Sequence, residues 1–176
     1  MSNEPGSRQR LLRGAKFDVE RVTVAAHDGS TRERELVVHP GSVVILPMLD
    51  DERLVLIRNH RYAVGRELWE LPAGTLEPGE DPAPCAAREL EEETGYRAAH
   101  IEALMQFLPV PGWCTERMFA YVARGLTPVG QKLEATEQIV AETRAFDEAI
   151  TMVRDGVIED AKTIAVLLYY ERFARA

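Results

Sequence analysis

The segment Gly74–Tyr96, GTLEPGEDPAPCAARELEEETGY, combines a glycine-containing turn with a cluster of carboxylates, and it decides how the rest of the chain is interpreted. On a helix, Glu89 and Glu93 lie one turn apart and Glu92 lies beside them. Like charges at this spacing repel by roughly 0.2–0.5 kcal/mol per pair. Such a face is either solvated or binds a cation. Oxygen ligands on one face suit Mg²⁺ or Mn²⁺, which also bind phosphates.

Local signals in the same segment predict where the helix begins and ends. Asp81 suits the N-cap position and Pro82 the first helical position. The helix is expected to run to about Thr94, because Gly95 fits the left-handed conformation that commonly follows a helix. A narrow apolar side would let this helix lie close to a sheet, and its residues are Ala83, Ala86, Ala87 and Leu90.

Two other side chains of this predicted helix have simple structural interpretations. Arg88 is expected to form an ion pair with Glu80 or Glu92, rather than to take part in chemistry itself. Cys85 is expected to be a small buried residue. With Cys114 it is one of only two cysteines, which are too few for a disulfide framework.

The composition is that of a globular domain with a real core. The chain has 176 residues, of which 45% are apolar and 28% charged. Its net charge of −8 argues against nucleic acid or an anionic membrane as the main partner. No apolar run reaches membrane-spanning length, and the N-terminus has no apolar signal core, so we expect a soluble cytoplasmic protein. Residues 1–13 are expected to be loose, and residues 14–176 to form a single domain.

The hydrophobic pattern predicts strands before and after the central helix. An antiparallel hairpin over 17–39 is indicated by valines on both sides of Asp28-Gly29. Further strands are expected near 41–48, 53–58, 68–71, 101–107, 117–123 and 138–146, with polar loops at 59–66 and 127–137. Helices over 147–155 and from 159 or 160 to about 174 close the chain. This order predicts a mixed α/β (α+β) fold with a mixed sheet covered on both faces.

The spacing of Gly74, Glu80, Arg88-Glu89, Leu90, Glu92-Glu93, Gly95 and Tyr96 resembles the Nudix box, G-x5-E-x7-R-E-U-x-E-E-x-G-U, where U is apolar or aromatic. Every defined position is filled. The resemblance implies the αβα sandwich of the Nudix hydrolases, with a mixed β-sheet and an N-terminal antiparallel hairpin, in agreement with the order of elements.

The resemblance extends beyond the box to HPGSVVILPML, VLIRNHRYAVG, ELPAGTLEPGEDP, PVPGWCTE and IEDAKTI. These segments are similar to the ADP-ribose pyrophosphatase branch, for which Pro111-Gly112 is a marker. The branch implies Mg²⁺-dependent hydrolysis, with Mn²⁺ as a possible substitute. The implied substrate is ADP-ribose or a related nucleoside diphosphate sugar, and the products are a nucleoside monophosphate and a sugar phosphate.

The resemblance also implies roles for particular residues. The metal ligands would be the Glu89 and Glu93 carboxylates, with Glu92 as an additional one and the carbonyl of Ala73. The remaining catalytic candidates are Glu116, which supports the site in relatives, and a general base in the loop after the box. For this base Glu137 aligns better than Glu134. The candidate substrate-binding residues are Arg61, Arg58, Glu35, Phe17 and Gly112.

One departure concerns recognition of the nucleobase. Relatives often stack the base between aromatic residues of the N-terminal hairpin, some of them from a second subunit. This chain has the charged run 32–35 where one such aromatic is expected, which leaves Phe17 and Trp113 as candidate rings. By resemblance alone we expect a homodimer in which the 17–39 hairpin contributes to the partner's site.

Two alternatives remain from the sequence. One is a Nudix hydrolase of another nucleotide, such as a nucleoside triphosphate or a dinucleoside polyphosphate; Pro111 and the DAKTI segment argue against it. The other is a non-catalytic, ligand-sensing Nudix domain. Such a domain would be expected to have lost carboxylates of the box or gained a basic helix-turn-helix, and neither is evident here.

Overall fold

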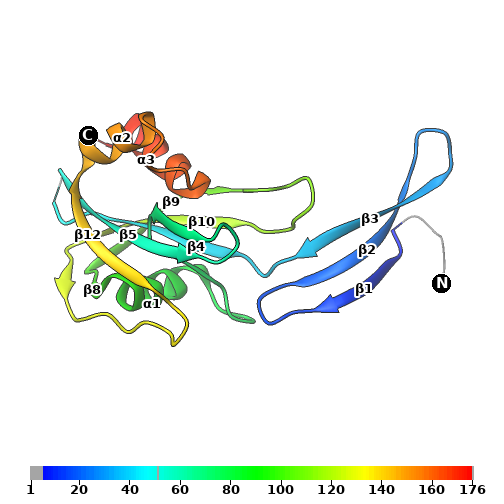
Figure 1. Cartoon of the computed structure of the whole chain (residues 1–176), viewed down its shortest axis with the longest axis horizontal. Coiled ribbons are helices and arrows are strands. Elements are labelled where there is room, and N and C mark those ends of the chain that lie inside the picture. Colours follow the sequence, from blue (N-terminus) through cyan, green and yellow to red (C-terminus); the bar gives the residue numbers. More distant parts are fainter. Residues whose placement is uncertain (1–5, 51, 176) are drawn as a thin grey trace.

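A computed structural model describes residues 6–50 and 52–175, with helices on both faces of a central layer of strands (Figure 1). The first part of the chain forms β1 (Arg8–Arg13), β2 (Asp18–Ala25), β3 (Thr31–Val38), β4 (Ser42–Pro47), β5 (Arg53–Arg61), β6 (Arg66–Glu70) and β7 (Ala73–Thr75). The second part forms α1 (Pro82–Thr94), β8 (Tyr96–Arg97), β9 (His100–Phe107), β10 (Met118–Arg124), β11 (Thr127–Pro128), β12 (Ile139–Ala145), α2 (Phe146–Arg154) and α3 (Ala161–Phe173).

The central sheet has the order β7-β4-β10-β9 and is mixed, since β4 pairs parallel with β10 and antiparallel with β7. All six residues of β4 are buried, as its continuous apolar sequence predicts. Because side chains alternate along a strand, Val43 and Ile45 pack with α1, whereas Val44 and Leu46 belong to the core beneath α2 and α3. The predicted mixed sheet with two covered faces is confirmed.

A second sheet, β12-β5-β6, completes the body. Its β5 strand continues to Arg61 and its β6 strand begins at Arg66, so the polar loop predicted over residues 59–66 is wrong for residues 59–61 and 66. Asn59, His60 and Arg61 are held in the ladder by their pairing with β6, and Asn59 is buried there. Pairing with a neighbouring strand thus overrides the polar character of the sequence.

Helix α1 has the predicted boundaries. Asp81 is the N-cap in an extended conformation and Pro82 is the first helical residue. Gly95 ends the helix with φ of 74°, and its N–H donates to the carbonyl of Glu91. Cys85, Ala86 and Leu90 are fully buried against the central sheet. The carboxylates of the box are therefore fixed with respect to the neighbouring β7 strand.

Helices α2 and α3 cover the opposite face (Figure 1). Asp160 caps α3, since its Oδ2 accepts a hydrogen bond from Thr163 N at 3.0 Å. The Thr163 hydroxyl in turn accepts from Leu71 N at 2.8 Å, which fixes the start of α3 next to the end of β6. The longest helices of the described ranges have 13 residues, and none combines the length and apolarity needed to cross a bilayer.

The N-terminal hairpin is part of a three-stranded antiparallel sheet, β1-β2-β3, which stands apart from the body as an arm (Figure 1). The expectation of a loose segment over residues 1–13 is corrected for residues 8–13, which form β1, while residues 1–5 lie outside the described residues. The sequence RQRLLR has no alternation that predicts burial, and all six residues are exposed. They form a strand because they pair with the edge of β2. The arm is anchored to the body where Val37 N donates to Trp113 O at 2.8 Å and Thr115 N donates to Val37 O at 2.9 Å.

Candidate active site

The carboxylates of α1 face the short strand β7. Glu93 is only 3% exposed, and its Oε2 accepts a hydrogen bond from Ala73 N at 2.8 Å. Burial raises the pKa of Glu93 to about 8; the nearby Glu89 and Glu137 raise it as well, while the Ala73 N–H and Arg61 act in the opposite direction. Glu89 is also buried, and this burial raises its pKa. Burial therefore disfavours the charged forms of both carboxylates, and their surroundings do not fully offset this effect.

Arg88 lies among these carboxylates. It donates to Glu89 at 2.7 Å, to Glu92 at 3.0 Å and to both oxygens of Glu80 at 3.1 and 3.2 Å. Its hydrogen bonds lower the pKa of Glu80 to about 2. The predicted ion pairs with Glu80 and Glu92 are confirmed, and the contact with Glu89 is added to them. Arg88 thus forms hydrogen bonds with two candidate metal ligands of its own helix, Glu89 and Glu92.

The donor set fits a hard divalent cation. The Ala73 N–H donates to Glu93, and the Glu89 side chain lies against Gly74, so two carboxylates of α1 meet the backbone of β7 at this corner. Within residues 6–50 and 52–175, no three His, Cys, Asp or Glu side chains converge as metal ligands. In this arrangement Arg88 donates to Glu89 and Glu92. Since the raised pKa of Glu93 reflects uncompensated burial, a cation would offset that cost.

Glu137 approaches the same carboxylates from the loop between β11 and β12. Its charge raises the pKa of Glu89, after the larger effects of burial and of Arg88, and it acts on Glu93 in the same direction. The loop turns back on itself here, because Glu134 N donates to Glu137 Oε2 at 2.8 Å and Glu137 N donates to Glu134 O at 3.0 Å. The Glu134 side chain is exposed. Glu137, the candidate favoured by the sequence, therefore acts electrostatically on two carboxylates of the box.

A cavity of about 340 Å³ opens beside β7. Arg61 lines it and donates from Nε and Nη2 to the two oxygens of Glu70 at 2.7 and 2.6 Å. Glu116 lines it as well, and its Oε1 accepts from the Ser42 hydroxyl at 2.6 Å. The remaining lining residues are His39, Ala73, Gly74, Thr75, Pro109, Val110, Met118, Asp160, Ala161 and Lys162. Arg61 and Glu116, far apart in the sequence, thus meet in one cavity.

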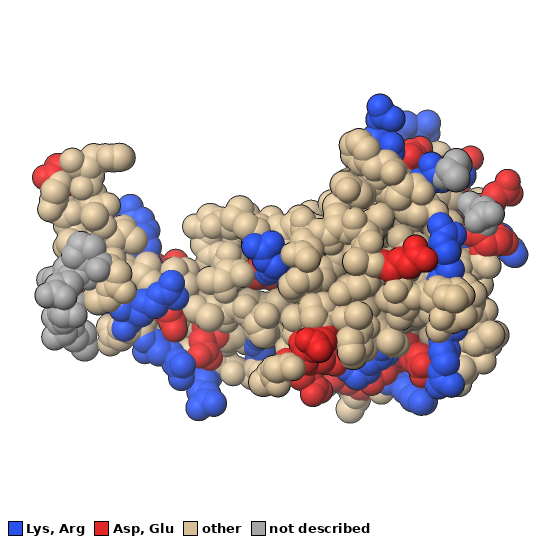
Figure 2. Space-filling model, turned by 180° about the vertical axis from the view of Figure 1, so that it is seen from behind, with Lys and Arg blue, Asp and Glu red and all other residues tan. Residues whose placement is uncertain are grey.

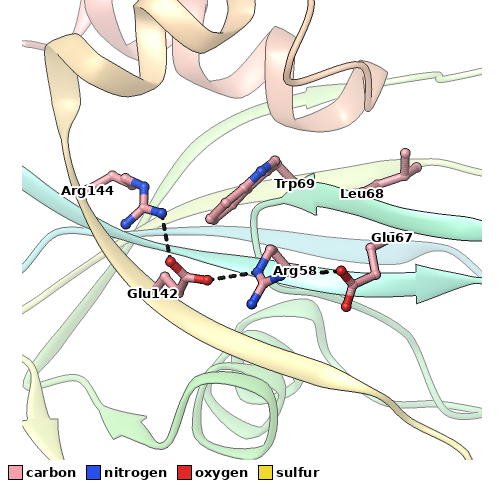
Figure 3. A pocket seen from close by; sticks show the side chains of 6 residues that line it. All are labelled: Arg58, Glu67, Leu68, Trp69, Glu142 and Arg144. Carbon is pink, nitrogen blue, oxygen red and sulfur yellow. Dashed lines mark hydrogen bonds and ion pairs between the residues drawn. The ribbon is translucent and has the colours of Figure 1, made fainter.

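Arg58 lies elsewhere. It is three residues before Arg61 on the same strand, so its side chain is on the opposite face of the sheet. There it donates to Glu142 at 2.7 Å and to Glu67 at 3.3 Å, and its guanidinium lies 5.8 Å from the centre of the Trp69 ring (Figure 3). These residues line a second pocket, of about 430 Å³. The structure does not bring Arg58 together with Arg61, although the sequence made both of them candidates for substrate binding.

A NUDIX domain family model matches residues 38–167 of the chain. The chain belongs to the Nudix hydrolase family. The matched region contains the box and every candidate metal ligand, together with Arg61, Glu116 and Glu137. Most of the arm lies outside the match.

Several Nudix proteins and related chains are similar over most of their length. A protein of Mycobacterium tuberculosis named ADP-ribose pyrophosphatase is 40% identical over 166 residues, which cover 92% of this chain and 80% of the relative. A methanol dehydrogenase activator of Bacillus methanolicus is 35% identical over 165 residues, covering 93% and 89%. A crystal structure of an ADP compounds hydrolase superposes with a TM-score of 0.82 at 24% identity, covering 97% of this chain and 95% of the other, which confirms the Nudix fold.

Three candidates of this Nudix chain lie away from the box. Phe17 and Glu35 are on the arm, where Phe17 is 44% exposed and Glu35 pairs with Arg21 at 3.2 Å. Gly112 lies in the β9–β10 loop that anchors the arm. Sequence reasoning assigned no role to Glu70 or Lys162, although both stand in the segments similar to the pyrophosphatase branch.

Proposed function

We propose that this Nudix hydrolase cleaves the pyrophosphate bond of ADP-ribose or a related nucleoside diphosphate sugar. The products would be a nucleoside monophosphate and a sugar phosphate. The observation that carries the proposal is the position of Glu93, a buried carboxylate hydrogen-bonded to Ala73 at the edge of the cavity that holds Arg61. The relative from Mycobacterium tuberculosis that is 40% identical carries the name ADP-ribose pyrophosphatase, and this name supports the choice of substrate.

Mg²⁺ is the proposed cofactor, with Mn²⁺ as a substitute. Glu89, Glu92, Glu93 and the carbonyl of Ala73 would hold it. When bound, such an ion neutralises phosphate charge and makes a water molecule more acidic. Because Arg88 occupies Glu89 and Glu92, we expect these two carboxylates to turn away from it when the metal binds. Glu80 would then retain Arg88.

The protein groups supply the remaining chemistry. The Glu137 carboxylate would take a proton from the attacking water while the oxygen of that water bonds to phosphorus. The bridging P–O bond breaks, and its electron pair leaves with the second phosphate. Arg61 has five N–H donors and gives two to Glu70, so the others can hold a phosphate oxygen. Glu116, fixed by Ser42, would support the wall of the site.

A homodimer is proposed for the arm. Figure 2 shows a concave edge between the arm and the body, and on the arm Leu11, Leu12, Phe17 and Val24 are exposed. Exposed apolar side chains at this density favour burial against a second copy. Phe17 and Glu35 would then meet the substrate in the partner's site. With charge at 32–35 in place of an aromatic, base selection would be weak.

A substrate panel tests the proposed function. Purified protein with Mg²⁺ would be given ADP-ribose, GDP- and UDP-sugars, nucleoside triphosphates and a dinucleoside polyphosphate. The proposal expects ADP-ribose to yield AMP and ribose 5-phosphate, with other nucleotide sugars cleaved less well. Triphosphates as the preferred substrates would contradict it. A preference for ADP-ribose over the other sugars above roughly a thousandfold, about 4 kcal/mol, would contradict the relaxed base selection.

A further inference from the structure

Glu70, at the end of β6, receives hydrogen bonds from two cations. It is fully buried, and Arg61 donates to both of its oxygens at 2.7 and 2.6 Å. Lys162 Nζ donates to Oε2, the oxygen that also accepts from Arg61 Nη2. A single guanidinium in this bidentate geometry already neutralises a buried carboxylate. Neutralising Glu70 therefore does not by itself explain why Lys162 is there.

The start of α3 places Lys162 at this point. Asp160 caps the helix through Thr163, and the Asp160 Oδ1 accepts from Lys162 Nζ at 2.8 Å. Thr163 is fixed in turn by Leu71 N. The IEDAKTI segment thus attaches the first turn of α3 to the strand that carries Glu70. The Lys162 ammonium group is therefore held between Glu70 and Asp160, and its side chain is 13% exposed.

The exposed part of this arrangement faces the cavity beside β7. Asp160, Lys162 and Arg61 line it together with Ala73 and Gly74, the backbone next to the candidate metal ligands. An ammonium group has three donors, and Glu70 and Asp160 are its partners among the described residues. Opposed charges lie side by side here, so this part of the wall offers a donor and an acceptor rather than one sign of charge.

We infer that Lys162 and Asp160 bind hydroxyl groups of the sugar on the far side of the pyrophosphate from the nucleoside. The inference rests on the proposed function for the identity of that sugar. A paired ammonium and carboxylate suits hydroxyls, which donate and accept. A phosphate would be repelled by Asp160, whereas Arg61, also in the cavity, is better placed for it. Glu70 is a positioning residue that fixes the separation between the phosphate contact and the sugar contact.

Two ligands separate a sugar contact from a structural role. ADP-ribose and the methyl ester of ADP share the base and the pyrophosphate, but only the first has the distal sugar. Lys162→Met should lower kcat/KM for ADP-ribose roughly 10- to 100-fold, mainly through KM, the scale for a lost hydrogen bond to a charged group. It should change the value for the methyl ester less than about threefold. Lys162→Arg should recover part of the loss.

Glu159→Gln is the matched control, because Glu159 lies just before α3 in the same IEDAKTI segment and its ion pair with Arg66 is exposed. This variant should leave kcat/KM unchanged for both substrates. Thermal unfolding of each variant checks the fold. An equal loss on both ligands would show that Lys162 acts only by holding Arg61, and no loss on either would show that it contacts nothing; both outcomes overturn the inference.

Equilibrium binding of the same two ligands in EDTA keeps this inference distinct from the proposed function. If wild-type protein in EDTA binds ADP-ribose more tightly than the methyl ester, and Lys162→Met removes the difference, the sugar contact stands. If the same protein then hydrolyses neither ligand with saturating Mg²⁺, the proposed reaction fails while the sugar contact is kept. If wild-type protein does not distinguish the ligands in binding or turnover, the sugar contact is wrong.

Discussion

A β-carbon on Gly74 would lie 1.9 Å from Cδ of Glu89, so the carboxylate of α1 occupies space that only glycine leaves open. The two residues are fifteen positions apart, Gly74 in β7 and Glu89 within α1. Their contact fixes the distance between β7 and the box carboxylates. The spacing of the motif is therefore a packing constraint as well as a set of ligands.

Gly74→Ala should displace the Glu89 side chain and lower kcat by roughly a hundredfold or more, the scale of a misplaced catalytic constellation. The backbone at Gly74 is not left-handed, so the fold should survive. A double-mutant cycle with Glu89→Ala isolates the mechanism. In the Glu89→Ala background the glycine substitution should cost little more. Full additivity of the two losses would argue against this contact.

Glu137→Gln should lower kcat by roughly 10²–10⁴-fold, the usual scale for loss of a general base. The amide oxygen can still accept from Glu134 N, so the turn should be kept. Glu134→Gln is the matched control, because its side chain is exposed in the same loop. Single-turnover kinetics would measure both. The reverse ranking would assign the base to Glu134, and no loss in either would move it to Glu116 or to a box glutamate.

The two thiols should react at very different rates. Cys85 is fully buried, and burial, with Glu80 as a further cause, raises its pKa to about 12. Near pH 8 almost none of it is thiolate, which is the reactive form. A disulfide reagent should therefore titrate one thiol, Cys114, in the native protein and a second only after unfolding. Rapid reaction of two thiols in the folded state would contradict the packing of α1.

The arm should matter for assembly and for substrate affinity. Deleting residues 1–31 should convert a dimer into a monomer and raise KM, as light scattering and steady-state kinetics would show. Because this deletion leaves β3 without its pairing strand, Phe17→Ala is the milder variant. It should raise KM with the dimer intact, by an amount set by roughly 1–3 kcal/mol of base stacking. A monomeric wild-type protein, with full activity after the deletion, would refute this role.

Local sequence patterns correctly predicted the parts of the fold that depend only on residues close together in the chain. Pro82 and Gly95 fix the ends of α1 regardless of what surrounds them, and the apolar run of β4 can only be buried on both faces. The box predicted the residues that meet at β7. These inferences needed no knowledge of which strands pair.

Contacts that depend on pairing could not be foreseen. Arg58 and Arg61 were both candidates for substrate binding, and Arg61 was expected in a polar loop. Both are in β5, where alternation places their side chains on opposite faces of the sheet. Likewise β1 forms only because β2 presents an edge to it. Lys162 and Glu70 are 92 positions apart, and nothing in either segment indicates the other. Sequence analysis identified the IEDAKTI segment but could not predict the contact between Lys162 and Glu70.

The most direct test of the account is the Mg²⁺-dependent release of AMP from ADP-ribose by wild-type protein and Glu93→Gln. Glu93 is buried at the centre of the site, so removing its charge should lower kcat at saturating Mg²⁺ by at least roughly a hundredfold, with no loss of thermal stability without metal. Glu91→Gln is the control on the same helix, since its partner Arg97 is exposed. It should retain wild-type turnover. A Glu93→Gln protein with near-normal kcat would contradict the proposed metal site.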